Sequence, residues 1–97
     1  MKEFKDLFGN KVKLTDERLK HILLRHPEIS ANVNDFSNTL KKPDVIIKSR
    51  IDKNIILYHK KYKDYYLVIV VNKAEKFIIT AYLSYKVKRG DMKWKKN

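Results

Sequence analysis

The chain has 97 residues, 43% of them hydrophobic, with only two Gly and two Pro, so it can bury one modest core but not two. Its 23 Lys and Arg against 11 Asp and Glu give a formal charge of +12, which favours a polyanionic partner such as nucleic acid or an anionic membrane surface. Cysteine is absent, which excludes disulfides and thiolate metal sites and is typical of a cytoplasmic protein.

The membrane alternative has little support. The longest apolar run, residues 67–71, is far too short to span a bilayer, and the N-terminus has no apolar signal-peptide core. We therefore expect no membrane partner and a cytoplasmic location. The charge alone does not identify a partner, because 19 of the cations are lysines and scattered lysines also keep proteins soluble.

The N-terminal half predicts two short β-stretches and two helices. Residues 4–14 are β-capable on either side of a Gly-Asn turn. Thr15 is a good N-cap for a first helix, and Pro27 should end that helix at or just before His26. One face of this helix carries Leu19, Ile22, Leu23 and His26. A second helix is predicted from the spacing of Ile29, Val33, Phe36 and Leu40, and it should stop at Pro43-Asp44.

The C-terminal half has a β pattern. Four segments are rich in Ile, Val, Tyr and Phe, namely residues 45–50, 54–61, 65–71 and 76–84. Short polar linkers join them, which suits antiparallel neighbours. Residues 85–97 form a basic tail that we expect to be partly ordered through Trp94. The predicted fold class is α+β: one domain over residues 1–97, with two N-terminal helices packed on a four-stranded antiparallel sheet.

An antiparallel sheet can cover one face and leave the other to water. The alternation of side chains along the predicted strands suggests an open face of hydroxyls and cations, which would suit RNA. The residues assigned to this face are Thr80, Tyr82, Tyr58, Lys60, Lys48 and Arg50.

Histidines, hydroxyls and free cations are the groups needed to cleave RNA without a metal. Histidine transfers protons near neutral pH, and lysine or arginine stabilises the phosphorane-like transition state. His26 lies on the apolar stripe of the first helix, where a buried structural histidine is as good an interpretation as a catalytic one. His21 lies on the opposite flank beside Arg25, where solvent-facing side chains are the simpler interpretation.

The other candidate residues are also ambiguous. Glu28 is placed either to orient a histidine or to begin the next helix, Thr80 and Tyr82 are also ordinary strand residues, and His59 has no partner that the sequence identifies. Metal binding is disfavoured, because His21 and His26 are five residues apart and the carboxylates are dispersed. We expect neither a metal nor another cofactor.

The order of four short motifs resembles a known family. The motifs are residues 21–28 (His-Ile-Leu-Leu-Arg-His-Pro-Glu), Pro43-Asp44, Leu57-Tyr58 and residues 79–82 (Ile-Thr-Ala-Tyr). In this order they resemble the small phage- and mobile-element-associated nucleases grouped with barnase, EndoU, colicin and RelE toxins, known as the BECR fold. The resemblance covers most of the chain, and its specificity lies in the order of the motifs.

The resemblance implies a RelE-like sheet and a metal-independent endoribonuclease, or a toxin-like domain with a cognate inhibitor (antitoxin) protein. It implies RNA as the partner, whether tRNA or mRNA. Carried over residue by residue, it nominates as site residues His21, His26, Arg25, Thr80 and Tyr82, with Lys86 and Lys88 as cations from the tail.

Two other functions fit the same residues. One is a non-catalytic nucleic-acid-binding module, in which the cations contact the backbone and the tyrosines stack on bases. The other is an interaction domain whose basic face meets an acidic protein such as an inhibitor. A shared fold does not guarantee activity, so the choice depends on how the candidate residues are arranged.

Overall fold

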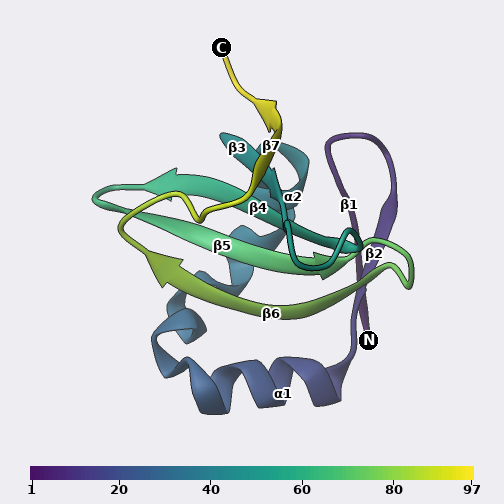
Figure 1. Ribbon diagram of the computed structural model, residues 1–97. Coiled ribbons are helices and arrows are strands. Elements are labelled where there is room, and N and C mark those ends of the chain that lie inside the picture. The colour runs from purple at the N-terminus through teal and green to yellow at the C-terminus, as the bar shows by residue number, and fades with distance from the viewer.

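The computed structural model describes residues 1–97 and contains a β-hairpin, a run of helical segments and five further strands (Figure 1). The elements, in chain order, are β1 (Lys2–Lys5), β2 (Lys11–Leu14), α1 (Asp16–Arg25), the 3₁₀ segment η1 (Pro27–Asp35), α2 (Phe36–Lys41), β3 (Val45–Lys48), β4 (Ile55–Tyr62), β5 (Tyr65–Asn72), β6 (Phe77–Ser84) and β7 (Asp91–Lys95).

The strands form one seven-stranded sheet in the order β1-β2-β6-β5-β4-β3-β7. Strands β3 to β6 make the predicted antiparallel meander. The hairpin extends it at one edge, where β2 runs parallel to β6 and the Lys13 N–H donates to the carbonyl of Lys76. Strand β7 extends the other edge by pairing with β3.

The predicted fold class, with two helices on a four-stranded antiparallel sheet of the BECR or RelE type, is therefore wrong: the fold is mixed α+β with a seven-stranded sheet. The reason is physical. The outer strands are largely charged, with sequences such as Asp-Met-Lys-Trp-Lys in β7. They are held by backbone hydrogen bonds to their neighbours, and a side-chain pattern does not report such bonds.

Helix α1 begins and ends where the sequence predicts. The Thr15 hydroxyl accepts a hydrogen bond from the Arg18 N–H at 3.1 Å, and the His26 N–H donates to the Ile22 carbonyl just before Pro27. Ile22 is fully buried, and His26 is half-buried at the end of the same stripe.

The second predicted helix is only partly correct, since its N-terminal part, up to Asp35, belongs to η1 and only Phe36–Lys41 is α-helical. This segment is rich in short polar residues, namely Ser30, Asn32, Asn34 and Asp35, which have low helix propensity. Here the Asn32 amide donates to the Asp35 carboxylate at 3.3 Å. The apolar spacing still reports burial correctly, because Ile29 and Phe36 are fully buried.

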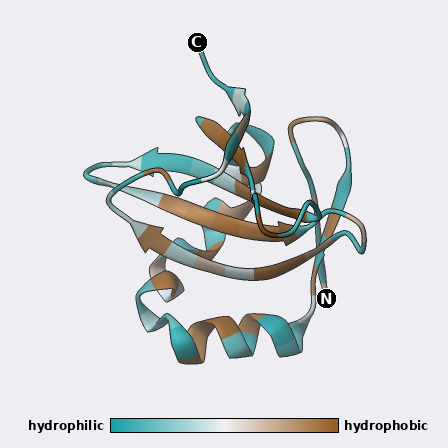
Figure 2. Ribbon diagram, viewed as in Figure 1, coloured by the Kyte–Doolittle hydropathy of each residue, from teal (hydrophilic) through white to brown (hydrophobic).

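The helical segments pack against one face of the sheet, and the core lies between these segments and the sheet. Figure 2 shows the apolar central strands facing α1, which carries both hydrophobic and hydrophilic residues, whereas the C-terminal segment is hydrophilic. The opposite face, called here the second face, is crossed by residues 85–90 on their way from β6 to β7 (Figure 1). None of the helices has the length and apolarity that a membrane span requires.

Candidate functional site

The strand register decides which candidate residues share a face. Tyr82 pairs with Val68, and Val68 pairs with His59, so these three side chains lie on the second face. Their neighbours in β4, Tyr58 and Lys60, therefore point to the helix face. The prediction that Tyr58 and Lys60 share a face with Tyr82 is therefore wrong. The sequence of β4 shows which of its side chains alternate, but it does not show which set lies on the same face as Tyr82.

Tyr58 contributes to structure. Its hydroxyl donates a 2.6 Å hydrogen bond to Oδ2 of Asp6, and both residues are buried. Burial first, and then the hydrogen bond to Asp6, raise the pKa of Tyr58. The other oxygen of Asp6 accepts the backbone N–H groups of Phe8 and Asn10. Tyr58 thus anchors the turn of the β1–β2 hairpin to β4.

The cations that were predicted to share a face with Tyr82 also lie away from it. Lys60 donates to the carbonyl of Lys42 at 2.8 Å, at the C-terminal end of α2. Lys48 is on the helix face, opposite Ile56. Arg50 is paired with Asp91 at 2.9 Å, beside the start of β7.

The structure brings His26 and Tyr82 together. Their ring centroids are 5.8 Å apart, with a tilt of 39° between the planes. His26 comes from the end of α1, and Tyr82 comes from the C-terminal half of β6, so a helix end and a polar strand end meet here. Lys88, from the crossing segment, places its Nζ 5.6 Å from the centroid of the Tyr82 ring.

The electrostatics of this group suit proton transfer. The Glu28 Oε2 lies 3.5 Å from Nδ1 of His26. A carboxylate at that position favours a proton on Nδ1 and leaves Nε2 free to accept one. Burial raises the pKa of Tyr82, so its phenol is neutral and can donate a hydrogen bond.

The fully buried His59 holds the crossing segment, a role that the sequence did not reveal. Its Nε2 accepts a 3.0 Å hydrogen bond from the Lys88 N–H, and its Nδ1 lies 3.1 Å from the Leu57 carbonyl, so Nδ1 carries the proton. Burial is the main cause that lowers the pKa of His59. The sequence did contain one signal: Leu57 and His59 are two residues apart in a predicted strand, so their side chains are expected on the same face.

A groove runs along the second face beneath the crossing segment, with a volume of about 540 Å³. Its polar lining includes three of the tail cations as well as the phenol of Tyr82. These residues are Tyr82, Lys86, Lys88 and Arg89. The two tail lysines nominated from the sequence therefore lie at the same groove as Tyr82.

The remaining candidates lie outside this group. His21 and Arg25 are exposed on α1, and His21 borders a shallow hollow with Thr15 and Glu17. Thr80 is half-buried on the second face, two residues before Tyr82. The structure thus places four side chains together, which we call the His26 site: His26, Glu28, Tyr82 and Lys88.

No group of three or more His, Asp or Glu side chains is placed to hold a metal ion. Searches with protein-family models, curated protein sequences and solved structures found no match to this chain. The functional assignment therefore depends on the residues of the site.

Proposed function

We propose that this protein is a small, basic, metal-independent endoribonuclease. The observation that carries the proposal is the meeting of an imidazole, a neutral phenol and an ammonium group at His26, Tyr82 and Lys88. These are a proton-transfer group, a hydrogen-bond donor and a cation, as acid–base transesterification of RNA requires, and the donor and the cation line the groove on the second face.

In this mechanism Nε2 of His26 takes the proton from the ribose 2′-hydroxyl, and the 2′-oxygen attacks the adjacent phosphorus. Lys88 and Lys86 stabilise the negative charge that develops on the phosphoryl oxygens. The Tyr82 hydroxyl donates a hydrogen bond to the phosphate or to the departing 5′-oxygen. The P–O5′ bond breaks as the Tyr82 hydroxyl transfers its proton to the departing 5′-oxygen, and protonated His26 then returns a proton to Tyr82. The products carry a 2′,3′-cyclic phosphate and a free 5′-hydroxyl.

The motif order that resembles BECR nucleases supports the same proposal, although the seven-stranded sheet differs from the sheet that the resemblance implies. By that resemblance the protein would be a toxin-like nuclease of phage or mobile-element origin that acts on cytoplasmic tRNA or mRNA. A cognate inhibitor would then be acidic, because it must meet a chain of charge +12.

The test is incubation of the protein with total RNA in the presence of EDTA, followed by analysis of the product ends. We expect cleavage that EDTA does not inhibit and products that end in a 2′,3′-cyclic phosphate. Cleavage that requires a divalent cation, or products with a 5′-phosphate, would refute this mechanism.

A second candidate function is RNA binding without cleavage. It is favoured by two aromatic–cation pairs: the Lys61 Nζ lies 5.8 Å from the centroid of the Tyr66 ring, and the Lys88 Nζ lies 5.6 Å from that of Tyr82. Tyr66 and Tyr82 are both half-buried on the second face, and the accessible part of a ring beside a cation can stack on a base. Salt-sensitive binding of RNA that is never cleaved would support this function over the first.

A further inference from the structure

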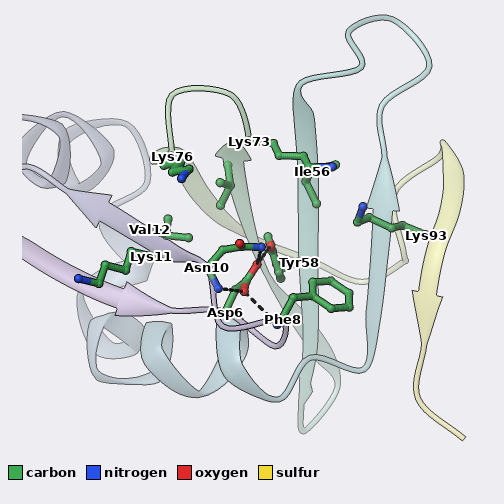
Figure 3. A pocket seen from close by; sticks show the side chains of 11 residues that line it. Asp6, Phe8, Asn10, Lys11, Val12, Ile56, Tyr58, Lys73, Lys76 and Lys93 are labelled. Atoms are coloured by element: carbon green, nitrogen blue, oxygen red, sulfur yellow. Dashed lines mark hydrogen bonds between the residues drawn. The ribbon is translucent and has the colours of Figure 1, made fainter.

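A second cavity lies on the opposite side of the sheet from the groove at Tyr82, between the β1–β2 turn and β7. It has a volume of about 280 Å³, which is near the lower end of the ~300–1,000 Å³ range of small-molecule sites. The residues drawn around it in Figure 3 are Asp6, Phe8, Asn10, Lys11, Val12, Ile56, Tyr58, Lys73, Lys76, Lys93 and the unlabelled Val71.

Two lysines converge on this cavity. Figure 3 shows the side chains of Lys73, from the β5–β6 turn, and Lys93, from β7, reaching toward one another near Ile56, whereas Lys11 points away. Lys11 already has a partner, Glu3, at 3.8 Å. Neither Lys73 nor Lys93 has a carboxylate within ion-pair distance.

The convergence of these cations has an electrostatic cost. Burial lowers the pKa of Lys93, and the positive charges of Lys73 and Lys48 lower it further. The nearby Asp6 acts in the opposite direction but is engaged in the hairpin turn, where it accepts hydrogen bonds from Phe8, Asn10 and Tyr58. A bound anion would relieve the repulsion between the lysines.

Part of the remaining lining is apolar, and it includes one exposed aromatic ring. Val12, Ile56 and Val71 are buried and form its apolar lining. Phe8 is 51% exposed, and the Lys93 Nζ lies 5.8 Å from its ring centroid. An exposed phenylalanine beside an apolar surface can stack on a planar ring, so the cavity offers cations for one end of a ligand and a ring-binding surface for the other.

We propose that this cavity binds a nucleoside phosphate, with the phosphate between Lys73 and Lys93 and the base against Phe8 and the apolar lining. A free mononucleotide and a single nucleotide within a nucleic acid share this chemistry, so either one fits the cavity. The proposal does not depend on the ribonuclease function. The cavity contacts Ile56 and Val71 on the helix face of the sheet, whereas the groove at Tyr82 and Lys88 contacts Leu57 and Val70 on the second face.

The test is calorimetric titration of the whole protein with AMP, adenosine and inorganic phosphate. We expect AMP to bind more tightly than either fragment. Lys73→Ala with Lys93→Ala should weaken AMP binding by about tenfold or more, since two charge-assisted contacts are lost. The matched control is Lys20→Ala with Lys41→Ala, which removes the same net charge from two exposed lysines of the helices and should change AMP affinity little.

Phe8→Ala separates the two halves of the site, because it should weaken AMP but leave phosphate binding unchanged. The proposal is overturned if AMP binds no better than phosphate, or if the cavity pair and the control pair weaken AMP equally. A 2′-O-methyl RNA, which cannot be cleaved through its 2′-oxygen, then identifies the source of the ligand. If it displaces a fluorescent AMP analogue in a manner dependent on Lys73 and Lys93, the ligand is a nucleic-acid nucleotide; if only AMP displaces it, the ligand is a free nucleotide.

Discussion

At the residue scale, the three histidines occupy three different environments, and each environment assigns a different role. His21 is exposed, His26 is half-buried against Tyr82, and His59 is completely buried beneath the crossing segment. Only His26 combines access to solvent with a neighbouring carboxylate, Glu28. The sequence already favoured His26 over His21, because a 3.6-residue repeat places it on the apolar stripe of α1.

The environment of His59 predicts a pH dependence of folding stability. Burial lowers its pKa in the folded protein, so below the unfolded value of about 6.5 the unfolded chain binds a proton that the folded chain does not. This contribution to stability is therefore present above about pH 6.5 and is lost as the pH falls below it. Urea unfolding measured between pH 7.5 and 5.5 should show this loss.

The control for this prediction is His59→Gln, which cannot titrate and keeps a side-chain acceptor for the Lys88 N–H. The variant should be less stable at pH 7.5 but should lose less stability on acidification than the parent. Equal losses in the two proteins would show that His59 is not the titrating group.

At the element scale, some boundaries were predictable and others were not. Thr15 and Pro27 set the two ends of α1 through local chemistry, which depends only on residues adjacent in the sequence. The meander was predictable because each strand pairs with the next one along the chain. The pairing of β7 with β3 was not, since it joins segments more than 40 residues apart through backbone groups.

The site was predictable to a similar extent. The meeting of His26 with Tyr82 follows from elements whose positions the sequence indicated, but the face of Tyr58 depends on register across three strands. The lysines of the second cavity, Lys73 and Lys93, lie in a turn and in an unexpected strand. A site built from such segments becomes visible only when the edges of the sheet are known.

The β3–β7 edge depends on a close backbone approach at Gly90, whose φ is +154°. A Cβ atom there would lie 2.5 Å from Cγ2 of Ile47 and 2.6 Å from the Lys48 carbonyl oxygen. Gly90→Ala should therefore displace β7 and reduce the free energy of unfolding by about 1–3 kcal/mol, as overpacking does.

Hydrogen exchange measures the effect directly, because amides of β7 and β3 should lose protection in the Gly90→Ala variant while those of β5 keep it. Lys95→Ala is the matched control, as an exposed residue in the same strand. If Gly90→Ala exchanges like Lys95→Ala, the close approach does not hold the edge.

At the scale of the whole molecule, a charge of +12 on 97 residues predicts that RNA binding is driven by counterion release. The slope of log K against log salt for single strands should be about −0.7 for each phosphate contacted. Binding measured from low to moderate salt with a 2′-O-methyl RNA should therefore weaken steeply. An affinity that hardly changes with salt would show that the charge is not the basis of attachment.

The central claim is that His26 transfers protons in RNA cleavage, and the most direct test measures rate and RNA affinity together. His26→Ala should lower the cleavage rate by about 10²–10⁴-fold, which is typical of a lost acid or base, while RNA affinity stays close to that of the parent. His21→Ala, on an exposed part of the same helix, should cleave near the parent rate. Circular dichroism must show that both variants are folded. If folded His26→Ala cleaves RNA at the parent rate, the account is contradicted.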